Sequence, residues 1–192
     1  MNETIYNILK RNSCRSFLNQ KVSKENMENI VRCGVWASIS KNIQPCKFTV
    51  ISNEELISGI SRATIDTINN DEATAIKFNN YKELINNGLT DIFYGSKNIV
   101  IISNIKGSFN HRYDAGCSIQ NMLLSAESLG IASCFIRELA EITTLPILKE
   151  IIERLDISSN HEVDAIIAFG YADPNLPKYE RNRDLTEVKL FD

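Results

Sequence analysis

Two short segments carry residues whose types and spacing could bind a charged organic molecule. In the first, Arg11, Asn12, Ser13 and Arg15 lie within five residues, just after a predicted short helix. Each guanidinium group offers a planar fork of donors, and the serine hydroxyl and nearby backbone amides add neutral donors. This segment therefore predicts a site for a phosphate group.

In the second segment, Asn42 and Gln44 precede Pro45 in a loop that leads into a predicted strand. Carboxamide groups both donate and accept hydrogen bonds, so they can recognise a polyol or the edge of a heterocyclic ring. A phosphate, a polyol and a ring edge are the parts of flavin mononucleotide (FMN). Taken together, the two segments indicate this cofactor.

Composition and charge exclude several other classes of protein. A net charge of -3, with both signs interspersed, argues against a nucleic-acid-binding protein. The two histidines are far apart in sequence and the five cysteines contain no Cys-x-x-Cys pair, so we expect no metal site. No apolar run approaches the roughly 18 residues of a membrane span, and the first residues show no signal-peptide pattern. We therefore expect a cytoplasmic protein with reduced thiols and no membrane partner.

The 192 residues, 43% of them hydrophobic, are enough for one domain over residues 1–192 with a single good core. Apolar spacing predicts helices around residues 5–9, after Ser23 as N-cap, over 114–129 and over 146–155, and helices with a mobile connection within 54–92. Aliphatic runs predict strands at 48–51, 99–102, 131–136 and 163–169. Helices interspersed with strands imply a mixed α/β layer structure. The proline-containing tail from residue 173 onward should pack across another surface.

The order and spacing of these segments resemble the nitroreductase family of FMN-dependent homodimeric oxidoreductases. The likeness runs nearly end to end. Besides Arg11–Arg15 and Asn42–Pro45, it is carried by Phe93-Tyr94-Gly95-Ser96-Lys97, by Asp114-x-Gly116-x-x-x-Gln120-Asn121, by the run from Leu129 to Ile136, and by Phe169-Gly170-Tyr171.

The resemblance implies an α+β fold with a mixed central sheet flanked by helices. It also implies an intertwined homodimer in which residues 173–192 cross to the partner subunit. Beyond the two segments above, it implies flavin contacts from the loop residues Ser38, Ile39 and Ser40, from Gln120, and from the main chain of Ile136 and Arg137 facing flavin N5. Arg181 or Arg183 in the tail would also bind the phosphate.

Several positions depart from the family pattern. Ser38 and Ile39 stand where proline and serine are usual, Cys46 replaces a tryptophan, Lys97 replaces a proline, and Arg137 occupies a position where glycine is frequent. These differences concern mainly the shape of the substrate pocket. We interpret Asp114 as a helix N-cap rather than a catalytic carboxylate, and Cys46 and Cys134 as buried small hydrophobic residues.

The activity implied by the resemblance is ping-pong hydride transfer, in which NADH or NADPH reduces the flavin and a nitroaromatic compound or quinone reoxidises it. No residue is assigned as general acid or base. One alternative keeps FMN but reduces another acceptor class, such as an activated alkene or a dehalogenation substrate. A second alternative, motivated by Ile39 and Arg137, is a non-catalytic flavin-binding or redox-sensing dimer.

Overall fold

The computed structural model describes residues 1–39, 43–143, 146–175, 183, 186, 188, 189 and 191. Its strands are β1 (Lys47–Ile51), β2 (Asn98–Ile105), β3 (Ala132–Ile136) and β4 (His161–Gly170). They form one sheet in the order β1-β2-β4-β3, and every neighbouring pair is antiparallel. All four strands lie within a residue or a few of their predicted positions.

The expectation of a mixed sheet is wrong for these four strands. β2 and β3 run in the same direction and are joined by a helix, which is the sequence signature of a parallel pair. In the fold, however, β4 lies between them and pairs antiparallel with both. Among the described residues, parallel pairing occurs at an isolated bridge between Ser13 and Ser133.

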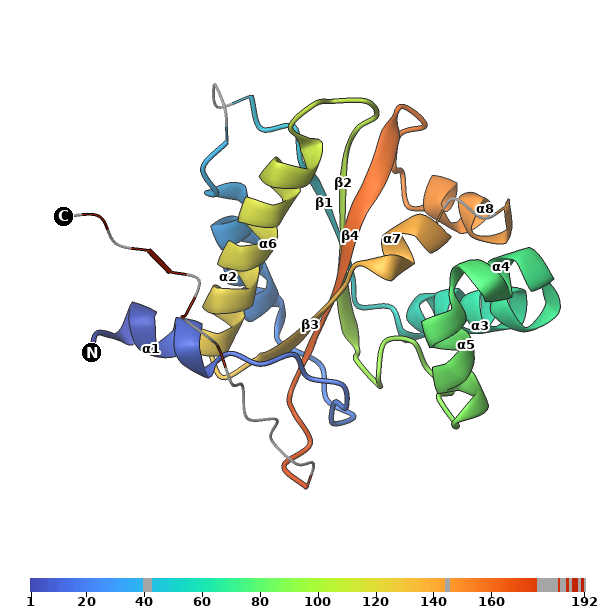
Figure 1. Cartoon of the computed structure of the whole chain (residues 1–192), viewed down its shortest axis with the longest axis horizontal. Helices are drawn as coiled ribbons and strands as arrows, with labels where there is room; N and C mark the ends of the chain where they lie inside the picture. Colours follow the sequence, from blue (N-terminus) through green and yellow to red (C-terminus); the bar gives the residue numbers. More distant parts are fainter. Residues whose placement is uncertain are drawn as a thin grey trace.

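Helices cover both faces of the sheet, as Figure 1 shows with the sheet seen nearly edge-on. One face is covered by α2 (Lys24–Val35) and α6 (His111–Ser128), and α1 (Glu3–Lys10) extends beyond them. The other side carries α3 (Glu54–Asn70), α4 (Glu72–Lys77), α5 (Asn79–Asn86), α7 (Glu138–Ile142) and α8 (Pro146–Arg154). The short helix α7 was not predicted.

Strand β2 supplies both halves of the core because alternate side chains point to opposite faces. Ile99 and Ile101 pack in the cluster under α3, α5 and α8. Val100 and Ile102 pack in the cluster under α2 and α6. The uninterrupted aliphatic run in the sequence therefore corresponds to a strand that is buried on both faces.

Two of the helix ends lie where local side-chain chemistry predicts them, and one does not. Ser23 caps α2, as predicted, because its Oγ accepts a hydrogen bond from the Asn26 N–H at 3.2 Å. Gly130 ends α6 with a left-handed φ of 69°, also as predicted. The N-cap assignment of Asp114 is wrong, since α6 begins at His111 and Asp114 is buried inside its first turns.

Candidate functional site

A small cavity lies at the end of β3, and we call it the β3 cavity. Its volume is about 240 Å³. Three of the predicted cofactor-binding residues, Arg15, Ile136 and Arg137, line it together. The rest of its lining is Tyr81, Leu84, Tyr94, Cys134, Phe135 and Glu138. The fold thus brings Arg15 of the first segment close to Ile136 and Arg137, the residues whose main chain was predicted to face flavin N5. About 120 residues separate them in the sequence.

Backbone hydrogen bonds fix the first segment to the edge of the sheet. Ser13 forms the parallel bridge with Ser133, and the Cys14 N–H donates to the Ser133 carbonyl at 2.9 Å. Two residues beyond Arg15, the Phe17 N–H donates to the Tyr94 carbonyl at 3.0 Å. The loop that carries the arginines is therefore held at both ends.

Cys134, which lines the β3 cavity, is buried. Burial raises its pKa to about 11, and the positive charges of Arg15 and Arg11 oppose this increase. Of these two arginines, only Arg15 lines the β3 cavity. The raised pKa keeps the thiol protonated at neutral pH, which agrees with the interpretation of Cys134 as a buried hydrophobic residue.

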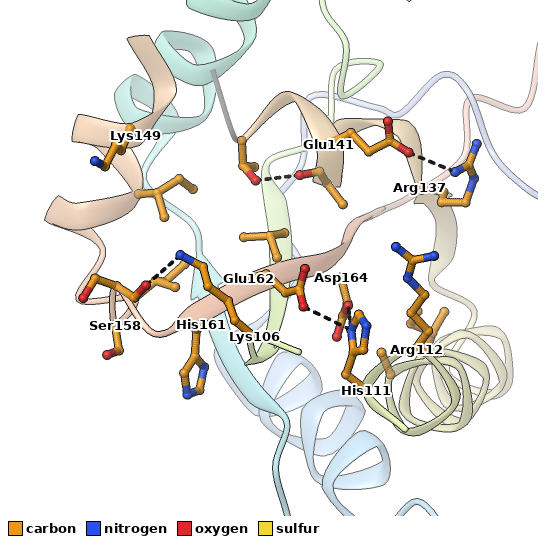
Figure 2. Close-up of a pocket in the computed structure, with 18 of the residues that line it drawn as sticks. Lys106, His111, Arg112, Arg137, Glu141, Lys149, Ser158, His161, Glu162 and Asp164 are labelled. Atoms are coloured by element: carbon orange, nitrogen blue, oxygen red, sulfur yellow. Dashed lines mark hydrogen bonds and ion pairs between the residues drawn. The ribbon is translucent and has the colours of Figure 1, made fainter. Parts of the chain in front are cut away.

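A larger cavity of about 730 Å³ lies among α6, α7, α8 and β4, and we call it the α6–α8 cavity. It shares Phe135 and Arg137 with the β3 cavity. Figure 2 shows its charged lining: Arg137 approaches Glu141, with 3.5 Å between Nη1 and Oε1, while Arg112 points into the same region.

The α6–α8 cavity also contains a histidine–carboxylate pair that the sequence reasoning missed. Nδ1 of His111 lies 2.6 Å from Oδ1 of Asp164 and 3.8 Å from Oε1 of Glu162 (Figure 2). Burial raises the pKa of Asp164, and the contact with His111 opposes that increase. The available signal was Asp164 itself, a charged residue inside the otherwise apolar run of β4. Within the described residues, no cluster suited to a metal ion was found.

The remaining predicted site residues do not line either cavity. Ser38 and Gln44 are exposed, Ile39 is half-buried, and Gln120 is exposed on α6. The Asn12 side chain donates to the Lys10 carbonyl at 3.3 Å, and Arg183 is exposed. Ser40, Asn42 and Arg181 lie outside the described residues. Asn121, next to Gln120, has a structural role because its Nδ2 donates to the Cys33 carbonyl at 3.1 Å and so joins α6 to α2.

No helix in the described part of the chain combines the length and the apolar character needed to cross a bilayer. All five cysteines are free thiols.

The chain resembles solved nitroreductase structures over its full length. A nitroreductase with bound FMN from Bacteroides fragilis superposes with a TM-score of 0.90 at 22% identity, covering 100% of both chains. A nitroreductase with bound FMN from Desulfitobacterium hafniense gives 0.87 at 23% identity, again with complete coverage. An FMN-dependent nitroreductase from Clostridium difficile gives 0.75 at 25% identity, covering 99% of both chains.

Sequence comparison leads to the same group. A protein of Archaeoglobus fulgidus, whose provisional name is NADH dehydrogenase/NAD(P)H nitroreductase, is 24% identical over 185 residues, which is 94% of this chain and 91% of that protein. The family model described as "Nitroreductase family" matches residues 8–171. This match spans most of the chain and both cavities, and the chain therefore belongs to the nitroreductase family.

Proposed function

We propose that this protein is an FMN-dependent oxidoreductase that uses NADH or NADPH to reduce nitroaromatic compounds, quinones or similar electrophilic acceptors. One observation carries the proposal: Arg15, Ile136 and Arg137 line one cavity, the β3 cavity, in a chain of the nitroreductase family. The relatives from Bacteroides fragilis and Desulfitobacterium hafniense have FMN bound, which supports the same cofactor here.

The residues present suit the parts of FMN. Arg11 and Ser13, with Asn12 and the local main chain, would bind the phosphate. Because Arg15 lines the same cavity as Ile136 and Arg137, and Arg11 and Ser13 do not, we place Arg15 beside the ring rather than the phosphate. When bound, the flavin would supply two-electron chemistry, accepting hydride from the nicotinamide at N5 and passing it to the acceptor.

Arg137 could serve this site through its main chain, since its side chain is occupied elsewhere. The guanidinium group contacts Glu138 and Glu141 on α7, with N···O separations of 3.9 and 3.5 Å. With the side chain engaged by α7, the Ile136–Arg137 main chain would be the part that faces flavin N5. A hydride transfer needs no protein acid or base, and none is assigned.

A second copy of the chain would complete the site. The volume of about 240 Å³ is below the 300–1,000 Å³ usual for organic cofactors, so one chain encloses only part of the ligand. Large apolar side chains are uncovered near the second segment, including Trp36 (82% exposed) and Ile43 (65% exposed). We propose a homodimer in which the flavin is also contacted by Gln120, by a tail arginine (Arg181 or Arg183), and by the loop residues Ser38, Ile39, Ser40, Asn42 and Gln44. The free cysteines make the cytoplasm the expected compartment.

The proposal is tested by the purified protein and one variant. The wild type should be yellow, with the absorbance of oxidised flavin, and NADH or NADPH should bleach it without oxygen. Arg11→Ala should weaken FMN binding about 10- to 100-fold, because a charge-assisted hydrogen bond to the phosphate is lost. The affinity for riboflavin, which lacks the phosphate, should not change.

Arg62→Ala, an exposed arginine on α3, is the matched control and should bind FMN normally. Absence of flavin binding by the wild type would refute the proposal. Binding without bleaching by either nicotinamide would favour the non-catalytic alternative. Turnover of enones or halogenated substrates, with no turnover of nitro compounds or quinones, would change the acceptor class.

A further inference from the structure

The backbone of Tyr94 adopts a conformation that few bulky residues accept. Its φ is 59°, in the left-handed region, and the next residue, Gly95, has a φ of 84°. The carboxylate of Asp91 fixes this turn by accepting hydrogen bonds from the N–H groups of Phe93 at 2.9 Å and Gly95 at 2.8 Å. The Tyr94 carbonyl in turn accepts from Phe17 at 3.0 Å. Such over-determined strain is typical of positions whose side chain has a specific use.

The location of Tyr94 suggests what this use is, since Tyr94 lines the β3 cavity together with Arg15 and Tyr81. Burial and the nearby Cys134 thiol raise the pKa of the Tyr94 hydroxyl, while Tyr81 and the positive charge of Arg15, which line the same cavity, oppose that increase. Tyr81 comes from α5 and is only 4% exposed, so its ring is fixed in the core. A guanidinium group has donors only, so Arg15 could bind the Tyr94 oxygen only as a donor.

Few other contacts hold the guanidinium group of Arg15 in one orientation. Its side chain is exposed, and among the described residues no carboxylate forms an ion pair with it. The Tyr94 hydroxyl, which lines the same small cavity together with Tyr81, is therefore a polar group placed to fix the direction of this guanidinium. We propose that Tyr94, supported by Tyr81, is a positioning residue that holds Arg15 at the ring end of the β3 cavity.

This inference rests on the proposed function, because the flavin ring is the group that Arg15 would face. A fixed cation beside the ring stabilises the more negative, reduced form of the flavin over the oxidised form. Loss of the Tyr94 hydroxyl should let Arg15 move away and should reduce that preference. The readout is therefore the midpoint potential of the bound flavin, which simple loss of packing at Tyr94 would not shift in this way.

The experiment measures FMN affinity and midpoint potential in the wild type, Tyr94→Phe, Arg15→Ala and the double variant. Tyr94→Phe keeps the ring and should make the preference for reduced flavin about tenfold smaller, which is a potential about 30 mV more negative for a two-electron couple. In the Arg15→Ala background the same substitution should change the potential no further, since Tyr94 acts through Arg15. Tyr81→Phe should shift the potential in the same direction by less.

Tyr6→Phe, a partly exposed tyrosine on α1, is the control and should leave both quantities unchanged. The thermal melting of each apo variant separates misfolding from a local effect, and Tyr81→Phe replaces Tyr94→Phe if the latter does not fold. An unchanged potential in a folded Tyr94→Phe, or an equal shift in the Arg15→Ala background, overturns the inference while FMN binding persists. A wild type that binds no FMN defeats the proposed function and this inference together.

Discussion

The two segments that indicate the cofactor differ in how much of their surroundings one chain provides. Arg11–Arg15 is joined to β3 through Cys14 and is followed by Phe17, which is buried. In the second segment Ile43 is exposed, as is Ser38 before it, and the backbone of Gln44 is left-handed with a φ of 46°. Under the proposed function, a single chain would build one half of the flavin site. The other half would present its side chains outward, toward a second copy.

The largest effect is expected from Trp36→Glu, which places a charge on the exposed apolar surface beside the second segment. If a second copy covers this surface, the charge is buried without a partner, so the protein should become monomeric at micromolar concentration and lose FMN. Sedimentation velocity and flavin fluorescence measure the two results. Ile76→Glu on α4, at an equally exposed position on the opposite helical layer, should remain dimeric and yellow. A dimeric, flavin-bound Trp36→Glu would place the interface elsewhere.

An intermediate effect is expected from Gly170→Ala, which disturbs the first segment without touching the cavities. The added Cβ would lie 2.8 Å from Cδ1 of Phe17, so Phe17 and the loop before it must move. Overpacking of this kind costs about 1–3 kcal/mol, and the melting temperature and FMN affinity should both fall. Gly59→Ala in α3 meets no atom within 4 Å and should instead stabilise the protein by about 0.5–1 kcal/mol. Normal FMN affinity in a destabilised Gly170→Ala would show that the first segment does not depend on Phe17.

The smallest effect is expected from Gln44→Gly. Glycine accepts the left-handed conformation, so the free energy of unfolding should change by less than about 1 kcal/mol. Loss of one neutral side-chain hydrogen bond should weaken FMN binding by about 2- to 10-fold. Chemical denaturation and flavin titration measure the two quantities. Unchanged FMN affinity would remove Gln44 from the proposed contacts and leave the second segment with a structural role.

Much of the secondary structure could be predicted from the sequence because its signals are periodic or local. The burial of β2 on both faces agrees with its uninterrupted aliphatic run. The buried face of α6, with Ile119, Met122, Leu123 and Ala126, agrees with the apolar spacing there. The short helix α7, with five residues, was missed because so few residues show no period. The short helix α1 was predicted from its apolar spacing, although those apolar side chains are largely exposed in the fold. The order of the strands depends on tertiary pairing and left no local signal.

The site could be predicted only in part for a similar reason. Residue chemistry indicated Arg11–Arg15, and family resemblance added Ile136 and Arg137, but only the fold shows that Arg15 shares a cavity with both. The sequence did not reveal Tyr81, Tyr94 or the pair of His111 with Asp164 as site residues. Each lies in its cavity beside residues that come from other helices and strands. Such contacts have no fixed spacing along the chain.

The late position of β4 in the chain has a consequence for biosynthesis. This strand lies in the interior of the sheet, between β2 and β3, yet it is the last of the four to leave the ribosome. Until residue 170 emerges, the nascent chain exposes strand edges and aliphatic side chains that β4 will later cover. Truncation before β4 should therefore yield an aggregating polypeptide, and chaperones that shield open sheet edges should increase the yield of the full-length protein.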